Sequence, residues 1–85
     1  MIDADSIRDT IRQSVNRITG IGPDQIHDSS NFRKDLDLDS LSALEVMVDV
    51  EYAFKIKLSE ERLQSVQTVQ DVIQVVQDSL NAVQA

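Results

Sequence analysis

The chain has 85 residues, of which 41% are hydrophobic and only 4% aromatic, and its fifteen acidic and eight basic side chains give a net charge of −7. A chain of this length has room for one small domain, so we expect residues 1–85 to form a single unit. The negative charge excludes nucleic acid as a partner and predicts partners with basic patches. Because the chain has no cysteine, disulfides and thiolate metal sites are excluded as well.

Two glycines and one proline leave few breaks in the chain, which favours an all-α fold. We predict a small four-helix bundle of three main helices and one short helix, with a long loop between the first two. The start of the chain lacks the basic region and apolar run of a secretory signal, and no apolar run is long enough to span a bilayer. We therefore expect a cytoplasmic protein with no membrane span, and we expect it to be a monomer.

The first predicted helix ends at Gly20, a typical C-terminal stop, and Asp3 and Asp5 near its start suit the helix dipole. Its apolar side chains recur at steps of four, four and three, and they are Ile7, Ile11, Val15 and Ile18. A long polar connection follows, and loops of this length inside small domains are usually functional or anchored. The expected apolar anchors are Ile26, Phe32, Leu36 and Leu38.

The most informative stretch is Asp35–Glu45, in which acidic residues alternate with leucines before Ser40 opens an apolar helical pattern. Ser40 has two interpretations. A serine at a helix start can cap the unpaired backbone N–H groups of the first turn. Alternatively, Asp39 supplies the cap, and Ser40 is free to carry a phosphate that the helix N-terminus would stabilise.

The predicted helix from Ser40 to Phe54 is apolar on two sides. The residues expected to face inward are Val46, Met47, Val50 and Phe54. A second apolar group at spacings of three and four consists of Leu41, Leu44 and Val48, and acidic residues flank it at Glu45, Asp49 and Glu51. Such a helix is either buried on both sides or open to a partner, and an apolar strip edged by carboxylates suits a basic, groove-bearing partner.

Two further helices complete the prediction. Ser59 should cap a short helix around Glu60–Leu63, after a turn at Lys55–Leu58. Thr68 should cap the last helix, with Asp71 at its third position. The apolar face expected of this last helix consists of Val69, Val72, Ile73, Val76, Leu80 and Val83.

A calcium site and a hydrolase site are both disfavoured. Asp35, Asp37 and Asp39 resemble the opening of an EF-hand loop, but that loop needs Gly at its sixth and Glu at its twelfth position, which this sequence lacks. Weak divalent-ion binding stays an alternative, and no metal site is assigned. A nucleophilic serine would need a base, and the sole histidine, His27, lies in the polar loop. We therefore assign no catalytic residue and expect no enzyme activity.

The sequence around Ser40 resembles the attachment motif and second helix of acyl carrier proteins. The motif Asp39-Ser40-Leu41 follows an acidic-leucine run and precedes Leu44-Glu45, and a Thr-Val-x-Asp-Val-Ile run opens the last helix. The resemblance covers nearly the whole chain. It implies that Ser40 carries 4'-phosphopantetheine in phosphodiester linkage, added from coenzyme A by a phosphopantetheinyl transferase with magnesium.

On this resemblance, the thiol of the arm carries acyl groups as thioesters between fatty-acid, polyketide or related synthase enzymes. The positions that meet such enzymes in the family are Asp39, Leu41, Leu44, Glu45, Val48 and Glu51. Two alternatives stay open. One is an aminoacyl or peptidyl carrier, and the other is an unmodified helical adaptor that uses the Leu41, Leu44 and Val48 strip for protein contact alone.

Overall fold

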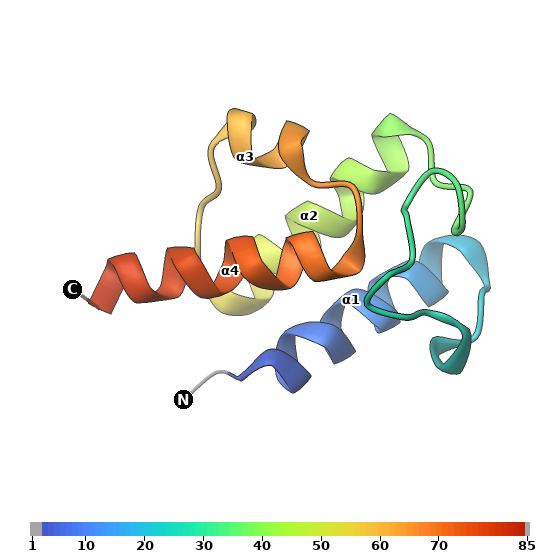
Figure 1. Cartoon of the computed structure of the whole chain (residues 1–85), viewed down its shortest axis with the longest axis horizontal. Helices are drawn as coiled ribbons and strands as arrows, with labels where there is room; N and C mark the ends of the chain where they lie inside the picture. Colours follow the sequence, from blue (N-terminus) through green and yellow to red (C-terminus); the bar gives the residue numbers. More distant parts are fainter. Residues whose placement is uncertain (1–2, 85) are drawn as a thin grey trace.

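The computed structural model describes residues 3–84, and their side chains up to residue 81. It contains four α-helices, α1 (Ala4–Thr19), α2 (Ser40–Phe54), α3 (Glu60–Ser65) and α4 (Val69–Gln84), and a 3₁₀ helix at Pro23–Gln25. Helix α1 packs against both α2 and α4, which run in the opposite general direction, and the short α3 lies between the end of α2 and the start of α4 (Figure 1). The predicted all-α four-helix bundle is confirmed. None of the described helices is long and apolar enough to cross a membrane.

The core is aliphatic, as the composition predicts. Its buried side chains are Ile7, Ile11, Val15, Ile26, Phe32, Leu36, Leu38, Val46, Met47, Val50, Leu58, Val69, Val72, Ile73 and Val76. The predicted faces of the first and last helices are thus confirmed, with Ile18 and Leu80 half-buried at the edge of the core. The side chain of Val83 lies outside the described ones. Burial of this apolar surface is the main driving force for folding, at roughly 25 cal/mol per Å².

Both ends of α1 and the start of α4 are formed by the residues that were predicted from the sequence. Asp3 Oδ1 accepts a hydrogen bond from Ser6 N at 2.9 Å, and Gly20 closes α1 with a left-handed φ of 82°. At α4, Thr68 Oγ1 accepts from Asp71 N at 3.2 Å, while the Asp71 carboxylate accepts from Thr68 N at 3.1 Å. This reciprocal pair satisfies two donors that a bare helix end would leave unpaired.

The long loop between α1 and α2 is anchored by all four predicted residues, since Ile26, Phe32, Leu36 and Leu38 are buried. Its backbone is also bonded to the segment just before α4. Phe32 N donates to Gln67 O at 2.9 Å, and Asn31 and Thr68 form an isolated antiparallel bridge. These bonds join positions far apart in the sequence, so the loop brings Ser40 to a fixed place.

Three details differ from the prediction. The short helix α3 extends to Ser65, beyond the predicted end at Leu63, although Ser59 caps it as expected. Phe54 is half-buried rather than fully inward, because it ends α2 at the margin of the core. The loop also contains the 3₁₀ turn at Pro23–Gln25, which a proline at a first helical position favours.

Candidate functional site

Ser40 lies at the first position of α2, and its side chain is exposed. The cap of α2 is made by its neighbour: Asp39 Oδ1 accepts a hydrogen bond from Ser42 N at 2.8 Å. The hydrogen bond from the Ser42 backbone lowers the pKa of the Asp39 carboxyl below its usual value, because it favours the charged form, and the Leu41 backbone N–H adds a smaller effect in the same direction. The structure thus shows that Asp39, and not Ser40, caps α2.

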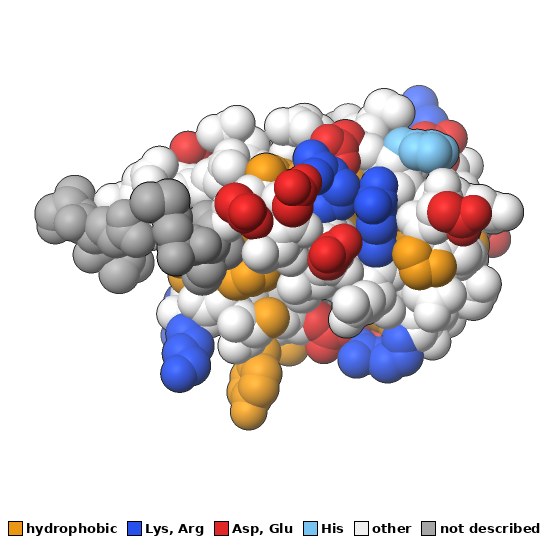
Figure 2. Space-filling view, turned by 90° about the horizontal axis from the view of Figure 1, so that it is seen from below, with side chains coloured by type: hydrophobic (Ala, Val, Ile, Leu, Met, Phe, Trp, Pro, Cys, Tyr) orange, Lys and Arg blue, Asp and Glu red, His pale blue; other side chains and the backbone are white. Residues whose placement is uncertain are grey.

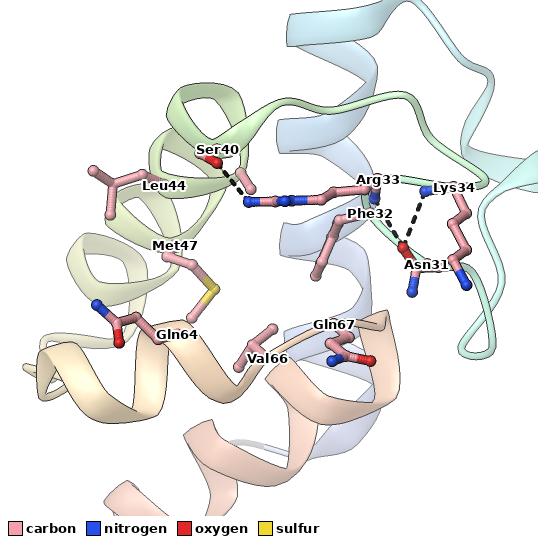
Figure 3. Close-up of a pocket in the computed structure, with 11 residues that line it drawn as sticks. Asn31, Phe32, Arg33, Lys34, Ser40, Leu44, Met47, Gln64, Val66 and Gln67 are labelled. Atoms are coloured by element: carbon pink, nitrogen blue, oxygen red, sulfur yellow. Dashed lines mark hydrogen bonds between the residues drawn. The ribbon is translucent and has the colours of Figure 1, made fainter.

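A hydrogen bond that sequence reasoning missed joins Ser40 to the preceding loop. The guanidinium of Arg33 reaches across the loop, and its Nη2 donates to Ser40 Oγ at 2.5 Å (Figure 3). The loop itself is tied at Asn31, whose Oδ1 accepts from the backbone N–H groups of Arg33 and Lys34, each at 3.0 Å. Arg33 is exposed and its side chain is directed toward Ser40, whereas the side chain of Lys34 extends away from it (Figure 3). The hydroxyl is therefore open to solvent and next to a cation.

A groove of about 740 Å³ opens beside Ser40. It is bounded by loop residues 31–34, by the first two turns of α2, and by residues 64–67 at the end of α3. Phe32, Met47 and Val66 form its apolar part, and Gln64 and Gln67 supply amides (Figure 3). None of the residues that line it is a histidine or a carboxylate, so the groove holds no base for Ser40.

The second apolar face of α2 is open. Leu41, Leu44 and Val48 are 67%, 45% and 52% exposed. Tyr52, which the prediction did not include, extends this strip and is 87% exposed. Its spacing of four from Val48 is the signal that could have found it. A run of large exposed apolar side chains on one helix marks a surface for contact with another molecule.

The acidic residues flanking this strip differ in their surroundings. Glu45 is exposed, whereas Asp49 and Glu51 are half-buried. Asp49 forms an ion pair with Arg17 and accepts a hydrogen bond from the hydroxyl of Ser14. Glu51 Oε2 accepts from Leu58 N at 2.9 Å, so it holds the connection between α2 and α3. Of the three, Glu45 is the carboxylate most available to a partner.

A surface on which acidic and basic side chains are mixed lies elsewhere on the molecule. Seen from below in Figure 1, the side on which α1 begins, acidic and basic side chains are interspersed (Figure 2). The ion pairs of the structure include Arg8 Nε with Asp28 Oδ1 at 2.6 Å, which holds the pKa of the Asp28 carboxyl below its usual value. Paired charges cancel at a distance, so a mixed surface steers a charged partner less than unpaired carboxylates do.

The three aspartates before α2 have different local surroundings. Asp35 Oδ2 accepts from Asn31 N at 2.7 Å, Asp39 caps α2, and Asp37 has a left-handed φ of 54°. Among residues 3–84, no group of three His, Cys, Asp or Glu side chains could hold a metal ion. The carboxylates of Asp35 and Asp39 accept hydrogen bonds from nearby backbone N–H groups, as Asp often does in turns and caps.

Comparison with known proteins agrees with this geometry. The family described as "Phosphopantetheine attachment site" matches residues 9–76. The "Meromycolate extension acyl carrier protein" of Mycobacterium leprae and that of Mycobacterium tuberculosis are each 37% identical over 67 residues, which cover 79% of this chain and 58% of theirs. The "Acyl carrier protein" of Chlamydia muridarum is 32% identical over 76 residues, which cover 89% of this chain and 99% of its own length.

The chain belongs to the phosphopantetheine-binding family of acyl carrier proteins. It spans 58% of the length of the two mycobacterial relatives named above. The cofactor predicted from the sequence, 4'-phosphopantetheine, is the group that defines this family. The residues around Ser40 fit that group, because an exposed hydroxyl is released from capping by Asp39 and adjoins a groove with apolar and amide walls.

Proposed function

We propose that Ser40 carries 4'-phosphopantetheine as a phosphodiester and that the chain transports acyl groups as thioesters on the thiol of this arm. The proposal rests on one observation at the start of α2: Asp39 caps the helix, and the Ser40 hydroxyl is exposed. The arm supplies the thiol that a chain without cysteine lacks. We further propose that residues 1–85 act as a single carrier domain.

The reaction partners that follow are a phosphopantetheinyl transferase, which loads the arm, and synthase enzymes, which add or take acyl groups. Fatty-acid, polyketide and related synthases all fit this chemistry. The likeness to carriers named for meromycolate extension favours the extension of fatty acyl chains. The chain itself is proposed to be a cytoplasmic, monomeric carrier and not an enzyme, since no histidine or carboxylate lines the groove at Ser40 to act as a base.

The proposed partner surface consists of Asp39, Leu41, Leu44, Glu45, Val48 and Glu51. Its centre is the exposed strip of α2, and its most accessible charge is Glu45. Exposed carboxylates beside an apolar strip complement a partner with a basic rim and an apolar groove. Because Glu51 is bonded to Leu58 N, its part in binding is expected to be smaller than that of Glu45.

A second candidate function is an unmodified adaptor, which the exposed strip of Leu41, Leu44 and Val48 would also suit. Incubation with a phosphopantetheinyl transferase, magnesium and coenzyme A, followed by intact mass measurement, separates the two. A carrier gains one phosphopantetheine, which Ser40→Ala loses and Ser42→Ala retains. An adaptor gains nothing, and gain by the Ser40→Ala variant would contradict the assignment of the site.

A further inference from the structure

We propose that Arg33 binds the phosphodiester formed on Ser40 and thereby directs the first part of the arm into the groove between the loop, α2 and α3. This inference rests on the proposed attachment at Ser40. It assigns Arg33 as a cofactor-binding residue, a role separate from attachment itself.

The geometry places the guanidinium where the phosphate would form. Arg33 Nη2 already donates to Ser40 Oγ at 2.5 Å, the oxygen through which the arm is joined. The non-bridging oxygens of a phosphodiester lie two bonds beyond that oxygen, within reach of the same side chain. Guanidinium groups bind phosphate oxygens in a planar, often bidentate arrangement that lysine does not reproduce.

The position of Arg33 is set by its loop. Its backbone N–H donates to Asn31 Oδ1, and Asn31 N donates to the Asp35 carboxylate at 2.7 Å. The preceding residue, Phe32, is buried and donates its backbone N–H to Gln67 O. An arginine presented by an anchored backbone loses less conformational freedom on binding an anion than one on a mobile loop.

The charge around Ser40 favours such a cation. A phosphodiester adds one negative charge beside the Asp39 carboxylate, and like charges this close repel. The first backbone N–H groups of α2 cannot offset this fully, because Asp39 already accepts a hydrogen bond from Ser42 N. Arg33 acts on both groups, since its charge also contributes to the low pKa of Asp39. It therefore neutralises the added charge at the point of attachment.

The contact between Arg33 and the phosphate also affects where the arm lies. Ser40 and Arg33 stand at its mouth, and the lining beyond them combines Phe32, Met47 and Val66 with the amides of Gln64 and Gln67 (Figure 3). A pantetheine arm has the same mixed character, with two methyl groups near the phosphate and two amides further along. A phosphate held by Arg33 fixes the direction in which the arm leaves Ser40, and the groove lies in that direction.

The test compares Arg33→Ala and Arg33→Lys with Lys57→Ala, which removes the same charge from an exposed lysine that does not line the groove. Each protein is loaded by a transferase and coenzyme A, and intact mass verifies one arm per chain. The ³¹P chemical shift of the phosphodiester and the nuclear Overhauser effects between the arm methyls and Phe32, Met47 and Val66 are then recorded.

In the wild type and in Lys57→Ala, we expect the same ³¹P shift and the same contacts to the groove. In Arg33→Ala, we expect the ³¹P shift to move and the docked population to fall about two- to fivefold, as for loss of an exposed ion pair. Arg33→Lys should lie between them, because it keeps the charge without the planar fork.

The outcomes separate this inference from the proposed function. Failure of the wild type to load would overturn attachment at Ser40 and the inference with it. Normal loading with identical spectra for Arg33→Ala and Lys57→Ala would overturn the inference alone. A change in loading rate without a change in these spectra would also overturn it, since Arg33 would then serve the transferase and not the bound arm.

Discussion

The two apolar faces of α2 carry the same kinds of side chain and have opposite surroundings. Val46, Met47 and Val50 are at most 4% exposed, whereas Val48 and Leu44, on the same helix, are about half exposed. The first face belongs to the hydrophobic core, and the second is open to solvent. Hydrophobicity therefore does not distinguish a core face from an open one in this helix, and burial in the core does not explain the apolar composition of the open face.

The largest difference between the two faces should appear when the same charge is introduced on each. Val50→Asp buries an unpaired carboxylate and should destabilise the protein by at least about 4 kcal/mol. Val48→Asp should stay within about 0.5 kcal/mol of the wild type, because surface substitutions rarely exceed that. Urea unfolding followed by circular dichroism measures both. Equal destabilisation by the two variants would mean that the second face is buried as well.

A smaller effect should separate the two glutamates beside the open face. Glu51→Ala leaves the backbone N–H of buried Leu58 without its acceptor and should cost about 1 to 2 kcal/mol. Glu45→Ala should be within about 0.5 kcal/mol of the wild type, because the Glu45 side chain is exposed. Urea unfolding measures the free energy of unfolding of both variants. If Glu45→Ala is destabilised as much as Glu51→Ala, the hydrogen bond from Leu58 N to Glu51 does not stabilise the fold.

The availability of Glu45 can be tested through partner binding. Glu45→Lys should slow loading by a transferase with a basic docking patch, by about two- to fivefold at low salt and less at high salt, because salt screens exposed charges. Asp24→Lys makes the same change of charge at an exposed residue of the 3₁₀ turn and serves as the control. A similar slowing by both variants, or one that salt does not alter, would indicate that net charge or structure is responsible.

The smallest expected effect concerns the cap that frees Ser40. The Asp39 pKa is lowered in the folded state from a reference value of 3.8, so the cap contributes stability fully above that value and loses it as pH falls through the folded pKa. The amide signal of Ser42 should therefore shift in acid, as the pH falls below the reference value of 3.8 and through the lowered pKa of Asp39. Asp39→Asn, which caps without titrating, should remove this shift. Persistence of the shift in that variant would assign it to another group.

Local rules predicted much of the fold from the sequence. The bounds of α2, the caps at Asp39, Ser59 and Thr68, and the four loop anchors follow from short-range spacing and from capping chemistry. The open strip was predicted as one of two possibilities, and Tyr52 was missed although its spacing fits. Which face the other helices cover depends on packing, and periodicity alone does not decide it.

The contacts that sequence reasoning missed at the site depend on the folded path of the chain. Asp49 pairs with Arg17, 32 residues away, and no local pattern joins such positions. The contact of Arg33 with Ser40 spans only seven residues, but it depends on the turn that Asn31 and the anchored loop impose. Long-range pairs and loop geometry are the features that required the structure.

The central claim is that Ser40 carries an acyl-loaded arm in the cell. The most direct test is intact and fragment mass measurement of the protein purified from its native host under conditions that preserve thioesters. We expect a chain that carries phosphopantetheine plus an acyl group, with the modification on the fragment that contains Ser40, and we expect neutral hydroxylamine to remove the acyl group and leave the arm. A native protein that carries no arm, or an arm attached to another residue, would contradict the claim.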